Sequence, residues 1–210
     1  MPANFTPGLL YVGLDFGTTG SAVAFTGTNF PNRNPFGTIR YIQRWGAADP
    51  SLHEAKVPSL ISYAVDNHNN QRWGLQVRAQ PGRTTCSWFK LQLDRHAPLT
   101  ELDDGFLNTH TATGIFEVPD GMSAQDVTAD FLGCLYRHTL RSLRSRGTTI
   151  PRLHFYLPVP ARWSDAAETA IKVAAVRAGF EDRQGDRLWL MKEPEAALYF
   201  ALHFGGQKFE

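Results

Sequence analysis

The sequence predicts an α/β fold in which three antiparallel strands come first and alternating strands and helices follow. Three observations predict this fold. Residues 8–44 contain three strand-like runs separated by turn-forming residues. Residues 123–147 repeat apolar positions at helical spacing. From residue 152 onward, strand and helix patterns alternate, which predicts a right-handed parallel crossover.

The N-terminal region is typical of an antiparallel meander. The runs "LLYVGLDF" and "SAVAFTG" flank a Gly-Thr-Thr-Gly turn, and "GTIRYIQRW" follows a loop rich in Asn and Pro. Residues 45–120 differ, because prolines separate short apolar segments and polar tracts such as "DNHNNQ". We therefore expect a single lobe over residues 1–210. Its core segments would be 1–44 and 121–210, with an inserted loop-rich α+β subdomain over 45–120.

The C-terminal half carries the clearest helix signals. Ser123 and Asp126 form a capping-box pattern before the first helical repeat, and Gly147 can close that helix. Ser164 and Gly179 bound a second helix, which lies between the strands "RLHFYLPVP" and "RLWLM". The segment "EPEAALYFALHF" predicts a last helix. This order of elements is that of the ribonuclease H-like fold, which also builds each lobe of actin-like ATPases.

Composition excludes several classes of protein. With 42% hydrophobic residues the chain is globular, and its net charge of +1 gives no general attraction to nucleic acid or an anionic membrane. The arginines over residues 137–146 are typical of a solvated face that complements a helix dipole, with a nucleic-acid patch as the alternative. Cys86 and Cys134 lack the spacing of a disulfide framework or a zinc site. Without a signal-peptide pattern or an apolar run of membrane length, we expect a cytoplasmic or nuclear protein that is not secreted.

The turn after the first strand is the first candidate site. Gly17 and Gly20 permit close approach of backbone N–H groups to an anion, and Thr18 and Thr19 add hydroxyl donors. Asp15 can hold Mg²⁺ through water, since Mg²⁺ retains several waters in protein sites. The motif lacks the GxxxxGK[ST] pattern of a Walker loop. From the residues alone, a phosphate loop and an ordinary glycine-rich hairpin remain equally open.

Three further residues are candidates at the ends of later strands. Pro194 fits the first helical position, so Glu193 is either a capping residue or a carboxylate that orients a hydrated metal or an attacking water. In "WFKLQLD", alternation puts Lys90 on the polar side of a short strand, where it is either solvated or in reach of a transferred phosphate. Pro158 and Pro160 form a rigid turn that ends their strand.

Together these segments resemble the heat-shock seventy-kilodalton chaperone family, within the actin-like ATPase superfamily. "VGLDFGTTGSAVAF" is similar to that family's first phosphate motif, and "VPSLISY" to its second-strand region. "PVPARWSDAAETAIKVAAVRAGF" resembles its "VPAYF" strand-helix unit, and "LMKEPEAALYFAL" its first connecting motif. The matches stand in the family's order over residues 10–204. The segment "WFKLQLD" resembles the corresponding segment of a divergent branch of the family, which lacks the usual peptide-binding domain.

The resemblance implies binding of ATP or ADP with Mg²⁺. It implies that Asp15 binds the hydrated metal ion and that Thr18 and Thr19 contact the phosphates. The remaining roles it implies are a γ-phosphate contact for Lys90 and a second carboxylate near the metal for Glu193. Pro160 would be the switch proline that relays nucleotide state.

The sequence departs from the family pattern in two ways. First, the arginine that normally partners the switch proline is replaced by Glu168, which puts the relay in doubt. Second, the sequence covers only part of the family's nucleotide-binding domain. The chain ends at "FGGQKFE", where the family's second lobe begins, so one wall of a two-walled nucleotide site is expected. By itself the chain should bind nucleotide weakly and hydrolyse it negligibly.

Three functions are compatible with these features of the sequence. The first is the N-terminal half of a chaperone-like ATPase domain, whose partners would be nucleotide, a second lobe or partner protein, and protein clients. The second is a non-catalytic one-lobe module that binds another protein. The third is a ribonuclease H-like nuclease, which the sequence disfavours because two-metal nucleases need several carboxylates near the first strand.

Overall fold

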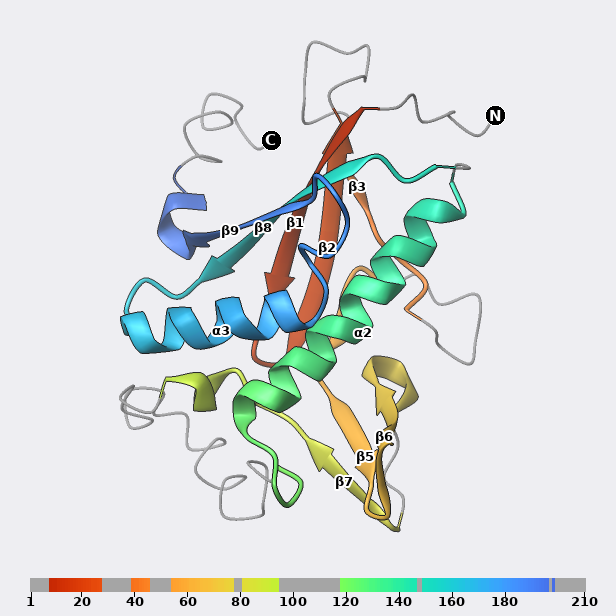
Figure 1. Cartoon of the computed structure of the whole chain (residues 1–210), viewed down its shortest axis with the longest axis vertical. Coiled ribbons are helices and arrows are strands. Elements are labelled where there is room, and N and C mark those ends of the chain that lie inside the picture. The colour runs from red at the N-terminus through yellow and green to blue at the C-terminus, as the bar shows by residue number, and fades with distance from the viewer. Residues whose placement is uncertain are drawn as a thin grey trace, which may run out of the picture.

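A mixed central sheet with two helices on one face forms the body of the protein (Figure 1). The computed structural model describes residues 8–27, 39–45, 54–77, 81–94, 118–146, 149–196 and 198. The strands of the central sheet are β1 (Leu9–Phe16), β2 (Gly20–Gly27), β3 (Arg40–Tyr41), β4 (Val57–Pro58), β8 (Arg152–Val159) and β9 (Arg187–Lys192). The helices are α2 (Ala124–Arg144) and α3 (Asp165–Arg177).

The central sheet runs in the order β3-β2-β1-β8-β9, and β4 pairs with β2. Strand β1 is antiparallel to β2 and parallel to β8, which is in turn parallel to β9. Helix α3 provides the connection between β8 and β9, as expected for parallel neighbours. This mixed α/β architecture fits the ribonuclease H-like and actin-like folds in general.

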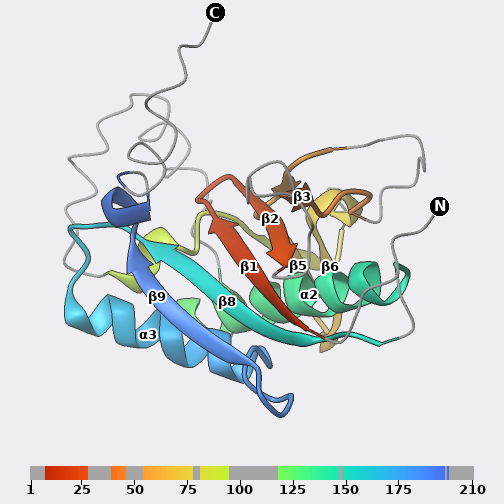
Figure 2. The same cartoon turned by 90° about the horizontal axis from the view of Figure 1, so that it is seen from above.

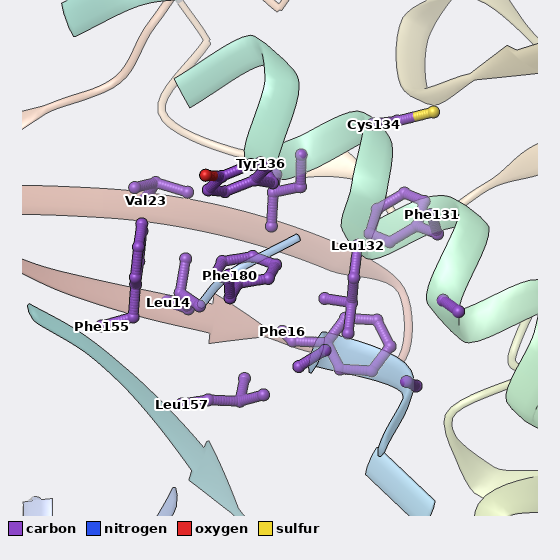
Figure 3. Packing of buried hydrophobic residues seen from close by; sticks show 14 of the residues in the cluster. Leu14, Phe16, Val23, Phe131, Leu132, Cys134, Tyr136, Phe155, Leu157 and Phe180 are labelled. Atoms are coloured by element: carbon purple, nitrogen blue, oxygen red, sulfur yellow. The ribbon is translucent and has the colours of Figure 1, made fainter. Parts of the chain in front are cut away.

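Alternation along β1 explains which face of the sheet is covered. Leu10, Val12, Leu14 and Phe16 are buried, and the residues between them are exposed. Both helices lie on the same side of the sheet (Figure 2). The buried side chains of β1 and β8 meet those of α2 in this layer, where Figure 3 shows Phe131 and Leu132 near Phe16.

The helix boundaries follow from local capping. The Ser123 side chain accepts from the Asp126 N–H, and the Asp126 carboxylate accepts from the Ser123 N–H, which confirms the predicted capping box. Ser164 caps α3 by accepting from the Ala167 N–H. Gly179 follows α3 with φ of 103°, a conformation that glycine adopts without strain. Gly147, the predicted end of the first helix, lies outside the described residues.

The predicted last helix is described only at its beginning. Helical residues run from Glu193 to Ala196 and include Leu198, and the rest of the predicted segment lies outside the described residues. The Glu195 carboxylate accepts from the Lys192 N–H at 3.1 Å, as an N3 residue does toward the capping residue. The helix therefore begins one residue earlier than predicted, with Lys192 as the capping residue, Glu193 as the first helical residue and Pro194 as the second.

Residues between β4 and α2 form a second, smaller sheet. Its three strands, in the order β6-β5-β7, are β5 (Ile61–Ala64), β6 (Asn67–Trp73) and β7 (Arg83–Cys86). Short 3₁₀ helices η2 (Gly74–Gln76) and η3 (Leu91–Leu93) follow β6 and β7. The sequence predicts that "DNHNNQ" is a polar tract between segments, whereas in the structure most of it belongs to β6. The prediction of an inserted subdomain over 45–120 stays a prediction.

The segment "WFKLQLD" is not the predicted strand. Trp88 has φ of 57°, which no extended strand contains, and Lys90 precedes the 3₁₀ helix η3. The alternation of Phe89, Leu91 and Leu93 therefore arises from a turn and a 3₁₀ helix. Lys90 is buried with 6% exposure, so the solvated alternative for this lysine is wrong.

Two smaller expectations concern cysteine chemistry and membranes. Cys86 and Cys134 are both buried free thiols, as expected of small apolar residues.

Across the described ranges, no helix combines the length and the apolar character needed to cross a membrane.

Candidate functional site

The carboxyl ends of β1, β8 and β9 lie at one edge of the central sheet, because the three strands are parallel (Figure 2). Asp15 is the penultimate residue of β1, Pro160 follows β8, and Glu193 follows β9. The β1–β2 hairpin begins at the same edge. In α/β sheets this edge is where ligands bind, since loops there expose backbone amides and side chains.

Lys90 joins this edge from a distant part of the chain. Its ammonium lies 3.3 Å from Glu193 Oε1, and its side chain is 7% exposed whereas that of Glu193 is 51% exposed. The same nitrogen lies 5.7 Å from the ring centroid of Phe16 and 5.6 Å from that of Trp163. A buried cation is therefore held by one carboxylate and two aromatic rings, which is an unusual position for a lysine without a function.

The hairpin between β1 and β2 is tightly packed. A Cβ on Gly17 would lie 2.5 Å from the Gly20 carbonyl oxygen, so this position excludes any side chain. Ser59 lies behind the hairpin, where its hydroxyl donates to the Gly17 carbonyl at 2.7 Å and its N–H donates to the Thr19 carbonyl at 3.0 Å. At the tip of the hairpin, Thr18 is half-buried and Thr19 is exposed.

Asp15 forms an ion pair with Lys56. This pair is separate from the ion pair between Lys90 and Glu193. Lys56 Nζ lies 2.8 Å from Asp15 Oδ2, and the side chains are 62% and 56% exposed. The Lys56 stem lies against Gly20 of the hairpin. A pair this exposed contributes about 0–1 kcal/mol to stability. The Asp15 carboxylate can therefore exchange its ammonium partner for a hydrated cation at little cost.

Pro160 and Glu168 lie beside the same edge. Pro160 is half-buried, and its carbonyl accepts from the Trp163 N–H at 3.3 Å, which places the Trp163 ring over Lys90. Glu168, at the position where the family resemblance implies an arginine, forms an ion pair with Lys192. This pair ties α3 to the end of β9, directly before Glu193.

The predicted residues thus gather at one sheet edge, although in two groups. In the first group, Lys90 contacts Glu193 directly. In the second, Asp15 of β1 forms an ion pair with Lys56, which directly precedes β4. Sequence reasoning missed Lys56, Ser59 and Trp163. Lys56 and Ser59 are placed by contacts over a long sequence separation, and Trp163 reaches Lys90, which is also distant in the chain. Ser59 lies in "VPSLISY", a segment that carried the family resemblance.

The residues present fit a hydrated magnesium ion better than a directly ligated metal. Among the residues that the structure describes, no group of three or more His, Cys, Asp or Glu side chains is arranged to hold a metal ion. Mg²⁺ in nucleotide sites retains several waters and uses one or two carboxylates with the substrate phosphates. The exposed Asp15 carboxylate beside a tight hairpin meets that requirement.

A second polar cluster lies between α2 and the small sheet. The Asp130 carboxylate accepts from the Tyr63 hydroxyl at 3.0 Å and from Gln71 Nε2 at 2.8 Å. Burial raises the pKa of Asp130, and burial together with the nearby Asp130 charge raises the pKa of Tyr63. Asp130 and Gln71 line an open polar cavity of ≈ 270 Å³. The two hydrogen bonds connect β5 and β6 to α2.

Comparison with known proteins points to a distant relationship. No family model matches the chain. The chain is similar to the human protein "Heat shock 70 kDa protein 12B", with 26% identity over 200 residues that cover 90% of this chain and 27% of that protein. The chain therefore spans about a quarter of the length of this relative. The similarity supports a distant Hsp70-like, actin-like ATPase relationship and suggests a nucleotide-binding ATPase-like domain.

Proposed function

We propose that this chain is the N-terminal lobe of a chaperone-like ATP-binding domain, with the DFGTTG hairpin as its phosphate loop. The observation that carries the proposal is the position of Lys90. Its buried ammonium lies between a ring of β1 and a ring that follows β8, and it contacts Glu193 after β9. A cation held at the edge where three parallel strands end is suited to a transferred phosphate.

Each residue at the edge has a role in this proposal. The hairpin amides and the hydroxyls of Thr18 and Thr19 would bind phosphate oxygens, with Gly17 and Gly20 allowing their close approach. Lys90 would contact the γ-phosphate, and Glu193 would orient the attacking water. Asp15 and Glu193 would hold a hydrated Mg²⁺, which supplies charge compensation for the phosphates when bound.

In a complete two-lobe protein the reaction would be hydrolysis of ATP by in-line attack of water, in which positioning and electrostatics provide the rate enhancement. The described lobe offers groups for the phosphates and the metal ion. The adenine pocket would come from a second lobe or a partner protein. On its own the chain would therefore bind nucleotide weakly through its phosphates and hydrolyse it negligibly.

Pro160 would act as a switch in an altered form. Its partner position holds Glu168, which is paired with Lys192 beside Glu193. We propose that movement of Glu193 on nucleotide binding is passed to α3 through this ion pair instead of through an arginine. Protein clients of the complete protein would be affected through that route.

The Glu168–Lys192 pair also favours a second candidate function. If the pair fixes α3 permanently, the lobe is a non-catalytic module that binds another protein. The two functions differ in nucleotide binding, because only the first requires an accessible phosphate loop.

The test is a calorimetric titration of the chain with MgATP, magnesium tripolyphosphate and adenosine. We expect similar weak binding of MgATP and tripolyphosphate, because both carry the groups that this lobe recognises, and no binding of adenosine. Binding of adenosine alone would contradict the phosphate-loop assignment. Binding of none of the three by the folded chain would favour the interaction module.

A further inference from the structure

Two buried serines lie directly behind the hairpin. Ser59 is 2% exposed and Ser21 is 0% exposed. Their hydroxyl oxygens are 2.9 Å apart, and the Ser59 hydroxyl also lies 2.7 Å from the Gly17 carbonyl oxygen. Ser59 stands after β4 and Ser21 stands in β2, so the contact joins two neighbouring strands at the base of the hairpin.

The protons in this network have one consistent arrangement. Each serine hydroxyl carries a single proton, and the Ser59 proton goes to the Gly17 carbonyl. The proton between the two serines therefore comes from Ser21. The result is a chain of two hydrogen bonds that runs from Ser21 through Ser59 to the hairpin backbone. Because both serine side chains are buried, removal of either hydroxyl leaves a polar group without its partner.

Ser59 holds the hairpin backbone at two carbonyls, those of Gly17 and Thr19. The described peptide bonds are trans. In a planar trans peptide unit, the C=O and the N–H of the next residue point in opposite directions. The two contacts therefore turn the N–H groups of Thr18 and Gly20 away from Ser59. Backbone N–H groups oriented in this way at a turn form concavities that bind anions.

From this geometry we propose that Ser59, supported by Ser21, is a positioning residue of the phosphate loop. It would not touch the ligand, and it would fix the two amides that do. The proposal rests on the proposed function and adds to it a residue outside the DFGTTG hairpin. A loop already ordered in its binding conformation loses less entropy when phosphate binds, so the effect appears as affinity.

The experiment compares magnesium tripolyphosphate binding by calorimetry in the wild-type chain and four variants. Ser59→Ala removes the positioning hydroxyl, Ser21→Ala removes only its support, and Ser59→Thr retains a hydroxyl. The matched control is Ser62→Ala. Ser62 of β5 is also buried, and its hydroxyl accepts a hydrogen bond from Arg83 Nε at 3.2 Å.

We expect affinity to fall about tenfold in Ser59→Ala and about threefold in Ser21→Ala, the range for loss of one buried hydrogen bond. Ser59→Thr should retain most of the affinity. Ser62→Ala should lower thermal stability by a similar amount and leave affinity unchanged. In amide NMR spectra, the shifts of Thr18 and Gly20 caused by tripolyphosphate should shrink in Ser59→Ala.

Three outcomes would overturn the positioning role. Equal affinity in Ser59→Ala and wild type would remove it and leave the phosphate site intact. Equal losses in Ser59→Ala and Ser62→Ala would show that affinity follows stability only. Absence of binding to the folded wild-type chain would refute the proposed function, and this inference with it. If Ser59→Ala does not fold, the affinity of Ser21→Ala and the Thr18 and Gly20 amide shifts measured in that variant decide.

Discussion

Lys90 is a buried cation, and among the described residues its one carboxylate partner is Glu193. Its partner Glu193 is half exposed, so replacing Lys90 leaves no buried unpaired charge. We predict that Lys90→Met changes the free energy of unfolding by less than about 1 kcal/mol, because an apolar side chain of similar length keeps the contacts with Phe16 and Trp163. Binding of MgATP should nevertheless weaken. Chemical denaturation and calorimetry measure the two effects separately.

A substitution of the other residue of this ion pair provides the control for stability. Glu193→Gln leaves the Lys90 ammonium buried without its carboxylate, so it should cost more stability than Lys90→Met, about 1–3 kcal/mol. Unchanged MgATP affinity in Lys90→Met would remove this lysine from the site.

Two glycines of the first strand and hairpin give a second prediction at this scale. A Cβ at position 17 would meet the Gly20 carbonyl oxygen, whereas a Cβ at position 13 meets nothing within 4 Å. Gly17→Ala should therefore lower the free energy of unfolding by about 1–3 kcal/mol and weaken phosphate binding. Gly13→Ala, within β1, should change stability by less than about 0.5 kcal/mol. Equal stability of the two variants in denaturant titrations would contradict the tight hairpin.

The candidate site was partly predictable from individual residues. Asp15 and Glu193 stand at the ends of predicted strands, so local pattern and strand order sufficed to place them at one edge. The contact between Lys90 and Glu193 joins residues 103 positions apart, and no local signal encodes it. The pairing of Ser59 with Gly17 spans 42 positions and was equally hidden.

The start of α2 allows a prediction at the scale of a single element. Hydrogen bonds from the side chain and backbone of Ser123, and then the contact with Arg177, lower the pKa of Asp126 from 3.8 to about 2. A carboxyl whose pKa is depressed in the folded state stabilises the protein above its unfolded pKa, and this stabilisation is lost as the pH falls from about 4 to about 2. Asp126→Asn should therefore lower the free energy of unfolding at pH 7 by about 1 kcal/mol.

This difference between wild type and Asp126→Asn should shrink toward zero at about pH 2, as urea titrations over a pH series would show. Asp120→Asn, an exposed carboxyl just before the same helix, serves as the control and should show no such trend. A difference that stays constant with pH would mean that the capping geometry, rather than the charge, stabilises the helix.

Helices and strands were predicted correctly where the residues that determine them lie close together in the sequence. Helices α2 and α3 were predicted because Ser123 and Ser164 cap them within three residues. The strand predicted at Lys90 was wrong because period-two alternation also occurs in a turn followed by a 3₁₀ helix, and Trp88 has a positive φ. Strand β6 was missed because its polar residues are held by pairing with β5 rather than by burial.

At the scale of the whole molecule, the two sheets share one core. Trp73 at the end of β6 and Phe89 before η3 both pack against Phe131 of α2, which also contacts Phe16 of β1. Asp130 adds hydrogen bonds from α2 to the small sheet. We predict that both sheets unfold in a single cooperative transition. Native-state hydrogen exchange should give similar opening free energies for the most protected amides of β1 and β5, and two separate unfolding steps would contradict this.

The central claim is that the DFGTTG hairpin binds the phosphates of MgATP with Asp15 at the metal side. Calorimetric titration of MgATP into the wild-type chain and Asp15→Asn tests it most directly, with Asp66→Asn as a control at an exposed turn of the small sheet. The account predicts weak binding by the wild type, a loss of about tenfold or more in Asp15→Asn, and no change in Asp66→Asn. Undiminished MgATP binding by a folded Asp15→Asn chain would contradict it.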